Sequence, residues 1–301
     1  MKETMPTLYF FVGKGGVGKS TLSALTSLYR SRNQQKTLLV SMDPAHNQQD
    51  IFQCTLSEKP TSVAGNLWIK QIDTEQRIQS YLKDTEDQLS KNYNYLRAFS
   101  IKDHFRAFQF SPGIEEHAML QAFSSIFQEY QDKELIIFDM PPTTLTLRFF
   151  SLPGITLAWI KELIKLREKI FRKQEIVSRI RFGKRQMETD PVLHKLRKMK
   201  KDYEKLSHLF KSPKILIQLV IKPDSLAMSE SQRIYQKLRD LDLPLANVLL
   251  NGSSGETRLK SLAKDIPAGN HHGFPEYSGS LIGLSNLEDY LNTQEHPLEQ
   301  V

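Results

Sequence analysis

The sequence predicts an α/β protein, in which a doubly wound, mostly parallel sheet carries an inserted helical subdomain. Three observations support this fold class. Continuous runs of apolar and β-branched residues recur along the chain, helix-like stretches separate them, and a glycine-rich loop follows the first run. Strands that alternate with helices are typical of parallel sheets covered by helices on both faces.

Five of these runs are expected to be buried strands, because parallel strands covered on both faces are apolar throughout. They occupy residues 8–12, 37–41, 134–138, 214–221 and 245–250. The clearest helices between them are expected at residues 19–32 and 227–241.

We expect one domain over residues 1–301, with residues 75–130 and 151–212 forming a helical subdomain inserted in it. Both segments lack strand-like runs and are rich in helix formers. Apolar residues between Leu157 and Val177 form a broad helical face. A narrower seam with alternating steps of four and three follows, which is typical of a packed helix: Val192, Leu196, Met199, Tyr203, Leu206 and Phe210.

Composition limits the classes of protein that fit. No run of eighteen apolar residues is present, which argues against a spanning helix, and the first residues lack an apolar signal region. The single cysteine, Cys54, excludes an internal disulfide and a multi-cysteine metal site within one subunit. We therefore expect a cytoplasmic protein.

The net charge of +7 is concentrated in one segment. Residues 151–212 hold 17 Lys and Arg against 7 Asp and Glu, so the rest of the chain is slightly acidic. Such a segment fits an acidic partner, nucleic acid or an anionic membrane surface, or is simply a solvated helical face.

The strongest motif is a phosphate loop, G-x-x-x-x-G-K-[ST], placed between a predicted strand and a predicted helix. Its backbone N–H groups and the helix N-terminus attract phosphates. Lys19 is expected to bridge the β- and γ-phosphates of ATP, and the Ser20 hydroxyl to bind Mg²⁺. The expected nucleotide contacts are Gly13, Lys14, Gly15, Gly16, Val17, Gly18, Lys19, Ser20 and Thr21.

Two acids follow predicted strands and are candidates for the hydrolysis chemistry. Asp43 is placed to orient the attacking water, although an Asp-Pro turn or a helix cap would use the same residue. Asp139 ends an apolar strand, which is the usual position for an acid that binds Mg²⁺ through water.

These motifs resemble the arsenical pump-driving ATPases and the ATPases that target tail-anchored membrane proteins. Lys14 matches the second lysine of their deviant Walker loop, and residues 41–47 resemble their first switch. Residues 138–148 follow their second switch, with Thr144 and Leu145 in place of glycine and histidine. The resemblance implies a homodimer, a catalytic Asp43, and a Lys14 that reaches the partner's nucleotide.

The resemblance extends to the nucleotide's base and sugar. Asp224, Asn251 and Pro275 match family positions that contact nucleotide. The family's zinc-binding Cys-x-x-Cys and metalloid-binding cysteines have no counterpart, since Cys54 stands alone. We therefore expect neither a zinc nor an arsenite site.

The sequence thus predicts a Mg²⁺-dependent ATPase whose switching is coupled to a client, which is a hydrophobic helix or a membrane protein. The basic segment fits peripheral contact with a membrane. A client-binding ATPase of this kind is not expected to bind nucleic acid. The alternative is a partition or positioning ATPase acting on DNA or a membrane surface. A phosphate-loop kinase fits less well, because of Lys14 and the two switch segments.

Overall fold

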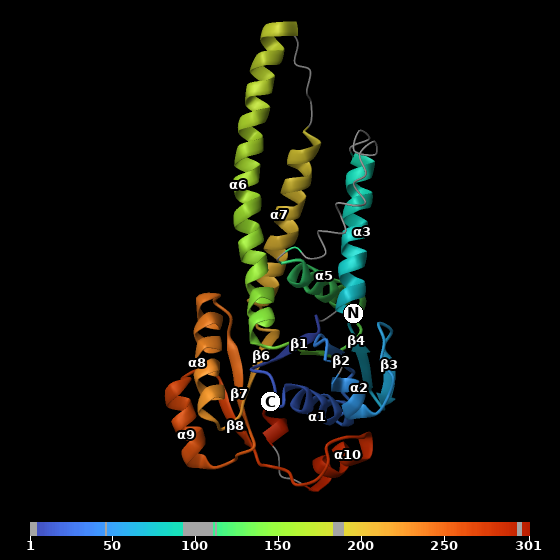
Figure 1. Cartoon of the computed structure of the whole chain (residues 1–301), viewed down its shortest axis with the longest axis vertical. Helices are drawn as coiled ribbons and strands as arrows, with labels where there is room; N and C mark the ends of the chain where they lie inside the picture. Colours follow the sequence, from blue (N-terminus) through green and yellow to red (C-terminus); the bar gives the residue numbers. More distant parts are fainter. Residues whose placement is uncertain (1–4, 46, 93–110, 112, 183–189, 294–296) are drawn as a thin grey trace. The chain divides into compact units, whose positions relative to one another are not determined.

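The computed structural model describes residues 5–45, 47–92, 111, 113–182, 190–293 and 297–301, and Figure 1 labels their elements. The strands are β1 (Thr7–Val12), β2 (Thr37–Ser41), β3 (Thr61–Ala64), β4 (Leu67–Gln71), β5 (Leu135–Asp139), β6 (Ile215–Ile221), β7 (Leu245–Asn251) and β8 (Asn270–Phe274). The helices are α1 (Lys19–Arg32), α2 (Asn47–Phe52), α3 (Thr74–Asn92), α5 (Ile114–Glu129), α6 (Thr143–Phe182), α7 (Pro191–Phe210), α8 (Ser225–Asp240), α9 (Glu256–Asp265), α10 (Leu284–Thr293) and the short 3-10 helix η2 (Pro297–Glu299).

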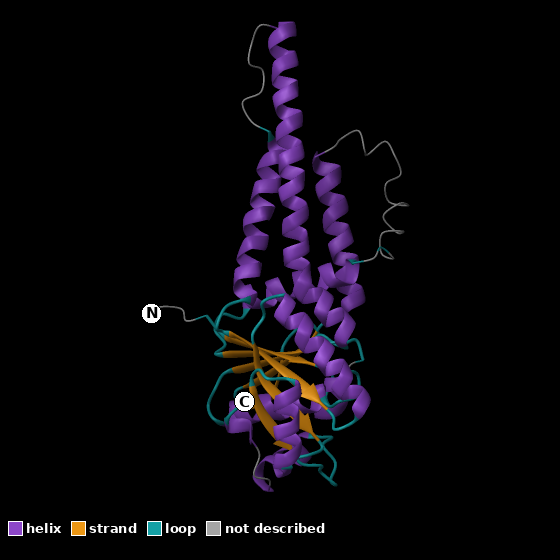
Figure 2. Ribbon diagram, turned by 90° about the vertical axis from the view of Figure 1, so that its left-hand side faces the viewer, coloured by secondary structure: helices purple, strands orange, loops and turns teal. Residues whose placement is uncertain are grey.

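The strands form one sheet, drawn in orange in Figure 2. Their order is β3-β4-β2-β5-β1-β6-β7-β8. Every neighbouring pair is parallel except β3 with β4. The predicted α/β class is therefore confirmed. Its central strand, β1, lies between β5 and β6, so the loop that follows β1 opens at the middle of the sheet.

Alternate side chains of β1 build the two cores. Phe10 is fully buried, with its ring 4.9 Å from that of Phe138 and 5.8 Å from that of Phe123 on α5. Its neighbours Tyr9 and Phe11 belong to the other core, together with apolar residues of α1. Because side chains alternate along a strand, α1 and α5 cover opposite faces of the sheet.

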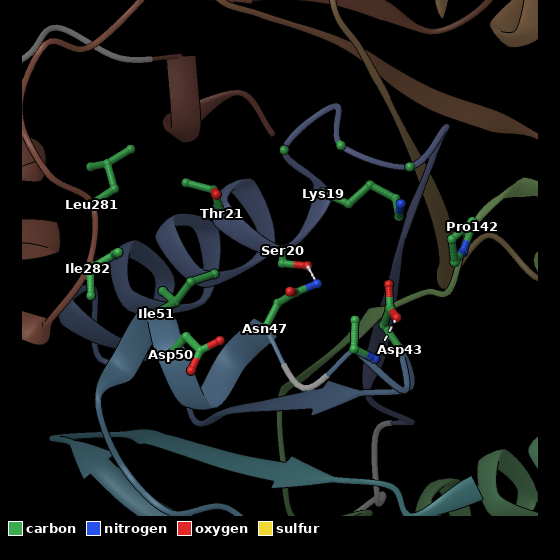
Figure 3. A pocket seen from close by; sticks show the side chains of 14 residues that line it. Lys19, Ser20, Thr21, Asp43, Asn47, Asp50, Ile51, Pro142, Leu281 and Ile282 are labelled. Carbon is green, nitrogen blue, oxygen red and sulfur yellow. Dashed lines mark hydrogen bonds between the residues drawn. The ribbon is translucent and has the colours of Figure 1, made fainter.

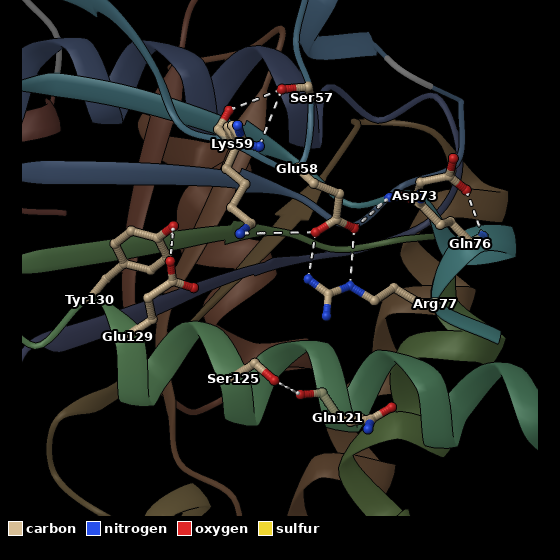
Figure 4. Close-up of polar contacts among 11 residues, drawn as sticks. Ser57, Glu58, Lys59, Asp73, Gln76, Arg77, Gln121, Ser125, Glu129 and Tyr130 are labelled. Atoms are coloured by element: carbon tan, nitrogen blue, oxygen red, sulfur yellow. Dashed lines mark hydrogen bonds and ion pairs between the residues drawn. The ribbon is translucent and has the colours of Figure 1, made fainter. Parts of the chain in front are cut away.

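Three strands are not among the predicted ones: β3, β4 and β8. Beside β4, a network around Glu58 ties the sheet to α3 (Figure 4). The Arg77 side chain donates two hydrogen bonds to the Glu58 carboxylate, and the ammonium of Lys70 lies 3.9 Å from the same group. Lys70 is buried, which lowers its pKa, and Glu58 opposes that shift. The network therefore gives a buried lysine its compensating charge.

Within residues 75–130, the described residues are helical except Ser111, Gly113 and Tyr130. The rings of Tyr81 on α3 and His117 on α5 stack 6.1 Å apart. Both helices belong to the compact unit of residues 1–149 and 213–301, which also contains the sheet. Residues 93–110 and 112 lie outside the described part of the chain.

Residues 150–212 form a second compact unit. In it, α6 and α7 lie side by side in both views (Figures 1 and 2). Asp190 caps the N-terminus of α7, and its other carboxylate oxygen accepts a 2.8 Å hydrogen bond from Arg167 of α6. At the other end of α7, the ring of Phe210 lies edge-on to that of Phe150 at 5.5 Å. Residues 183–189 lie outside the described part, and the assignment of 75–130 and 151–212 to one subdomain stays a prediction.

Candidate functional site

The loop after β1 has a backbone that only glycine fits at two points. Gly13 has a φ of 151°, and a Cβ there would lie 2.4 Å from the carbonyl oxygen of Val220. Gly18 has a φ of 96°, and its Cβ would lie 2.2 Å from the side-chain nitrogen of Asn251. That nitrogen donates to the carbonyl of Val17 at 2.9 Å. The loop is therefore wrapped tightly against the ends of β6 and β7.

The N-terminus of α1 opens directly from this loop. No side chain caps it, so its first N–H groups remain available to an anion. Lys19, the first residue of α1, is 5% exposed, and its ammonium donates to the carbonyl of Lys14 at 3.1 Å. Burial lowers the pKa of Lys19, and the carboxylates of Asp139, Asp43 and Glu230 oppose that shift.

Asp43 lies at the carboxyl end of β2 and is mostly buried. Its Oδ1 accepts a 3.0 Å hydrogen bond from the backbone N–H of Ala45. This is the turn that the sequence offered as the alternative role of Asp43. The turn orients the carboxylate without excluding a catalytic role, because Asp43 also lines the cavity described below.

Asp139 is completely buried at the carboxyl end of β5. Its Oδ2 accepts a 2.8 Å hydrogen bond from the amide of Gln48, while Oδ1 has no hydrogen-bond partner among the described residues. Burial raises the pKa of Asp139 to about 6, and Gln48, the Ser20 hydroxyl and the charge of Lys19 oppose that shift. A nearby cation would favour the ionised form.

A cavity of about 550 Å³ joins the loop to Asp43 (Figure 3). Its size is in the range of small-molecule sites. Glycine backbone and the start of α1 form one wall, and apolar side chains form another. The lining residues are Gly15, Gly16, Gly18, Lys19, Ser20, Thr21, Asp43, Ala45, Asn47, Asp50, Ile51, Pro142, Leu281 and Ile282.

The segment after Asp139 is fixed by its own hydroxyls. Thr146 donates to the carbonyl of Pro141 at 2.6 Å, and Thr143 donates to Glu230 of α8, also at 2.6 Å. Pro142 lies between these contacts and faces the cavity. The threonines are thus engaged with the protein, and the proline is the part of this segment that reaches the cavity.

The three residues expected at the base and sugar do not line this cavity. Asn251 lies against the loop itself. Asp224 caps α8 by accepting a 2.7 Å hydrogen bond from Ala227, and it lines a separate cavity of about 300 Å³. Pro275 follows β8 and is half-buried. The nucleotide-binding roles of all three stay predictions.

The structure adds site residues that no sequence motif identified. Asp50 and Ile51 of α2, and Leu281 and Ile282 before α10, line the cavity. Gln48 lies behind it, against Asp139. For the α2 residues, the only signal in the sequence was that the helix begins at Asn47, the last residue of the segment that resembles the first switch.

Phosphate loops in this setting, with acids at the adjacent strand ends, define the class of P-loop nucleotide-hydrolysing proteins. Within that class, the chain belongs to the anion-transporting ATPase family, whose model matches residues 7–263. The predicted resemblance and the predicted ATPase activity are thereby confirmed.

The curated relatives agree with this family. An ATPase ASNA1 homolog of Entamoeba dispar is 32% identical over 254 residues, which cover 80% of this chain and 75% of that protein. An ATPase ASNA1 homolog of Dictyostelium discoideum is 30% identical over 249 residues, covering 80% and 70%. A protein of Aquifex aeolicus, provisionally named arsenical pump-driving ATPase 2, is 28% identical over 250 residues, covering 81% and 79%. The alternative of a partition or positioning ATPase is not favoured by these matches.

Among the described helices, none is long and apolar enough to cross a membrane. The described residues also contain no cluster of three or more His, Cys, Asp or Glu side chains arranged for a metal ion. Cys54 is a free, partly buried thiol whose pKa is raised by burial.

The raised pKa of Asp139 predicts how pH affects the stability of the nucleotide-free protein. Between about pH 4 and about 6, the folded carboxyl keeps a proton that the unfolded chain releases. The free energy of unfolding therefore falls as pH rises through this window, and it stays lower at higher pH. Asp139→Asn lacks this ionisation, so its stability relative to the parent should rise by about 2–3 kcal/mol from pH 4 to pH 7.

Urea unfolding of both proteins in EDTA, at several values of pH from 4 to 8, measures this difference. A difference that stays constant over the whole range would contradict the raised pKa.

Proposed function

We propose that the cavity binds ATP with Mg²⁺ and that its hydrolysis switches the protein between two states. One observation carries the proposal: Lys19, Ser20 and Asp43 line a single cavity, with Asp139 buried beside them. The uncapped N-terminus of α1 and the ammonium of Lys19 would bind the phosphates. The base and sugar would extend toward Asn251, Asp224 and Pro275.

The metal is assigned to Ser20 and Asp139. A hydroxyl and a carboxylate are suitable hard oxygen donors, and the unpartnered Oδ1 of Asp139 can accept a hydrogen bond from metal-bound water. When bound, Mg²⁺ neutralises charge on the transferred phosphoryl group. Asp43 is assigned to the attacking water. Its carboxylate would orient this water toward the γ-phosphate, while one carboxylate oxygen is fixed by the hydrogen bond from Ala45.

Replacing the Asp43 carboxylate tests this assignment. Asp43→Asn keeps the hydrogen bond from Ala45 but removes the negative charge that orients water. We expect the nucleotide affinity to stay within about twofold, while the hydrolysis rate falls at least about a hundredfold, the usual scale for a positioned base. Asp50→Asn is the matched control, because Asp50 lines the same cavity from α2 and its substitution should leave hydrolysis nearly intact.

The two quantities are measured by binding of a fluorescent ADP analogue and by release of phosphate. Hydrolysis by Asp43→Asn at the parental rate would refute the catalytic role of Asp43.

We further propose that two copies share their nucleotides through Lys14. The Lys14 side chain is half-buried and is absent from the lining of the cavity in its own subunit. Its backbone carbonyl instead accepts from Lys19. A lysine that flanks a phosphate site without entering it is suited to neutralise phosphates bound by another copy.

ATP should therefore promote dimer formation, and Lys14→Ala should weaken it. We expect a nucleotide-dependent increase in mass, measured by light scattering with Asp43→Asn protein and ATP, that is lost when Lys14→Ala is added. Lys14→Arg keeps the charge and should retain most of the effect. The proposal that two copies share nucleotide is wrong if the parent stays monomeric with ATP, or if the Lys14→Ala variant assembles like the parent.

The client-binding surface is assigned to α6. Five apolar side chains are exposed at steps of four, four, three and four, which places them on one face of the helix: Ile155, Trp159, Leu163, Leu166 and Ile170. Trp159 is 67% exposed. Exposed stripes of this kind mark interaction sites, and a hydrophobic helix is the partner whose shape and chemistry fit.

The flank of the stripe is basic. Lys161, Lys165 and Lys169 recur at steps of four and are exposed on the adjacent face of α6. They favour a client with acidic residues next to its apolar segment, or contact with an anionic membrane during delivery. Since α6 begins at Thr143, directly after Pro142, the same helix connects the second switch segment to the stripe.

Introducing a negative charge into the stripe tests this surface. Trp159→Asp and Leu166→Asp should each weaken binding of a fluorescent, membrane-type helical peptide at least about tenfold, because each large side chain contributes about 1.5–3 kcal/mol when buried. Ile176→Asp is the matched control: Ile176 is equally exposed on the same helix but lies off the stripe.

Fluorescence anisotropy with parent and variants gives the affinities. Equal losses in all three variants would indicate a general effect on the helix and not a client-binding face.

A further inference from the structure

We propose that Gln48 is a positioning residue for the Mg²⁺ site, holding Asp139 and linking the first switch segment to it. No motif in the sequence marks this side chain. The inference rests on the proposed metal site at Ser20 and Asp139, and it adds a residue from a third element, α2.

A single nitrogen atom of Gln48 makes all three of its side-chain contacts. Its amide nitrogen lies 2.8 Å from Oδ2 of Asp139, 3.0 Å from the carbonyl of Ser20 and 3.0 Å from the hydroxyl of Ser23. The side chain is completely buried. One NH₂ group has two protons, so three acceptors at these distances share them. Gln48 thereby connects β5, α1 and α2 at a single point.

Two buried oxygens at this point lack donors. Neither Oε1 of Gln48 nor Oδ1 of Asp139 has a hydrogen-bond partner among the described residues. Buried acceptors without partners are rare in folded proteins, and two on a hydrogen-bonded pair of side chains suggest a missing donor. Water bound to a Mg²⁺ at Ser20 supplies such donors. The pair therefore has the hydrogen-bonding capacity expected of groups that surround a hydrated ion.

The position of Gln48 in the chain gives this contact a second consequence. Gln48 lies on the same short helix as Asn47, whose side-chain nitrogen is 3.5 Å from the Ser20 hydroxyl, and as Asp50, which lines the cavity. The helix follows Asp43 after three residues. A shift of the first switch segment would therefore move the Asp139 carboxylate as well as the group that orients water.

Groups that hydrogen-bond to metal-binding residues typically change metal affinity ten- to a hundredfold when they are removed. Gln48→Met keeps the length and volume of the side chain but removes the amide. We expect it to raise the Mg²⁺ concentration that gives half of the metal's effect on nucleotide binding by about tenfold or more. The affinity for nucleotide in EDTA should stay within about twofold of the parent.

The readout is binding of a fluorescent ADP analogue, first in EDTA and then during a Mg²⁺ titration. Gln49→Met is the matched control, because it makes the same change at the next residue, whose amide donates to Gln71 away from the site. Its Mg²⁺ dependence should equal that of the parent. Thermal unfolding in EDTA shows whether each variant is folded.

Gln48→Asn provides a second test if the methionine variant does not fold. It keeps an amide but is one methylene shorter, so it cannot reach Asp139 from the same backbone position, and it too should raise the Mg²⁺ requirement. The inference is overturned if a folded Gln48 variant shows the parental Mg²⁺ dependence, or loses affinity equally with and without Mg²⁺. A parent protein whose nucleotide binding ignores Mg²⁺ would instead overturn the metal site of the proposed function.

Discussion

The pairing of β5 between β1 and β2 is the constraint on which the rest of the site depends. It sets Asp139 beside Phe11, the next-to-last residue of β1, on one side and beside Ser41, the last residue of β2, on the other. The phosphate loop and the first switch segment leave the sheet from these two neighbours. A shift of β5 by one residue would turn Asp139 toward the opposite face and bring an apolar side chain under α1.

Charge balance explains why so many polar groups are tolerated here. Lys19, Asp43 and Asp139 are all nearly or fully buried, and the ammonium of Lys19 and the two carboxylates offset part of each other's desolvation cost, although the two carboxylates repel each other. The balance is incomplete, since burial still raises the pKa of Asp139 and lowers that of Lys19. A nucleotide and its metal together bring one group of each sign, so this residual charge imbalance favours the binding of both.

The sequence could predict the parts of the fold whose signal is local. The strands at the centre are continuous apolar runs, and the phosphate loop carries its function in consecutive residues. β8, by contrast, reads Asn270-His271-His272-Gly273-Phe274, because it lies at the sheet's edge and His272 finds its partner only in Asn247 of β7. β3 is short and partly exposed for the same reason. Such strands form because of the contacts that they make with neighbouring strands, and the periodicity of their own residues carries no information about those contacts.

The same distinction separates Gln48 from the residues that the sequence did reveal. Glutamine is usually exposed, and nothing in its neighbours predicts complete burial. Its role appears only when α2 is folded back so that one amide meets β5 and α1 together. α6 presents the opposite case: the sequence showed its apolar residues, but only the structure divides them into a buried set with Ile160 and an exposed stripe with Trp159. Packing removes one face from water, and the face that it leaves exposed is the one free to bind a partner.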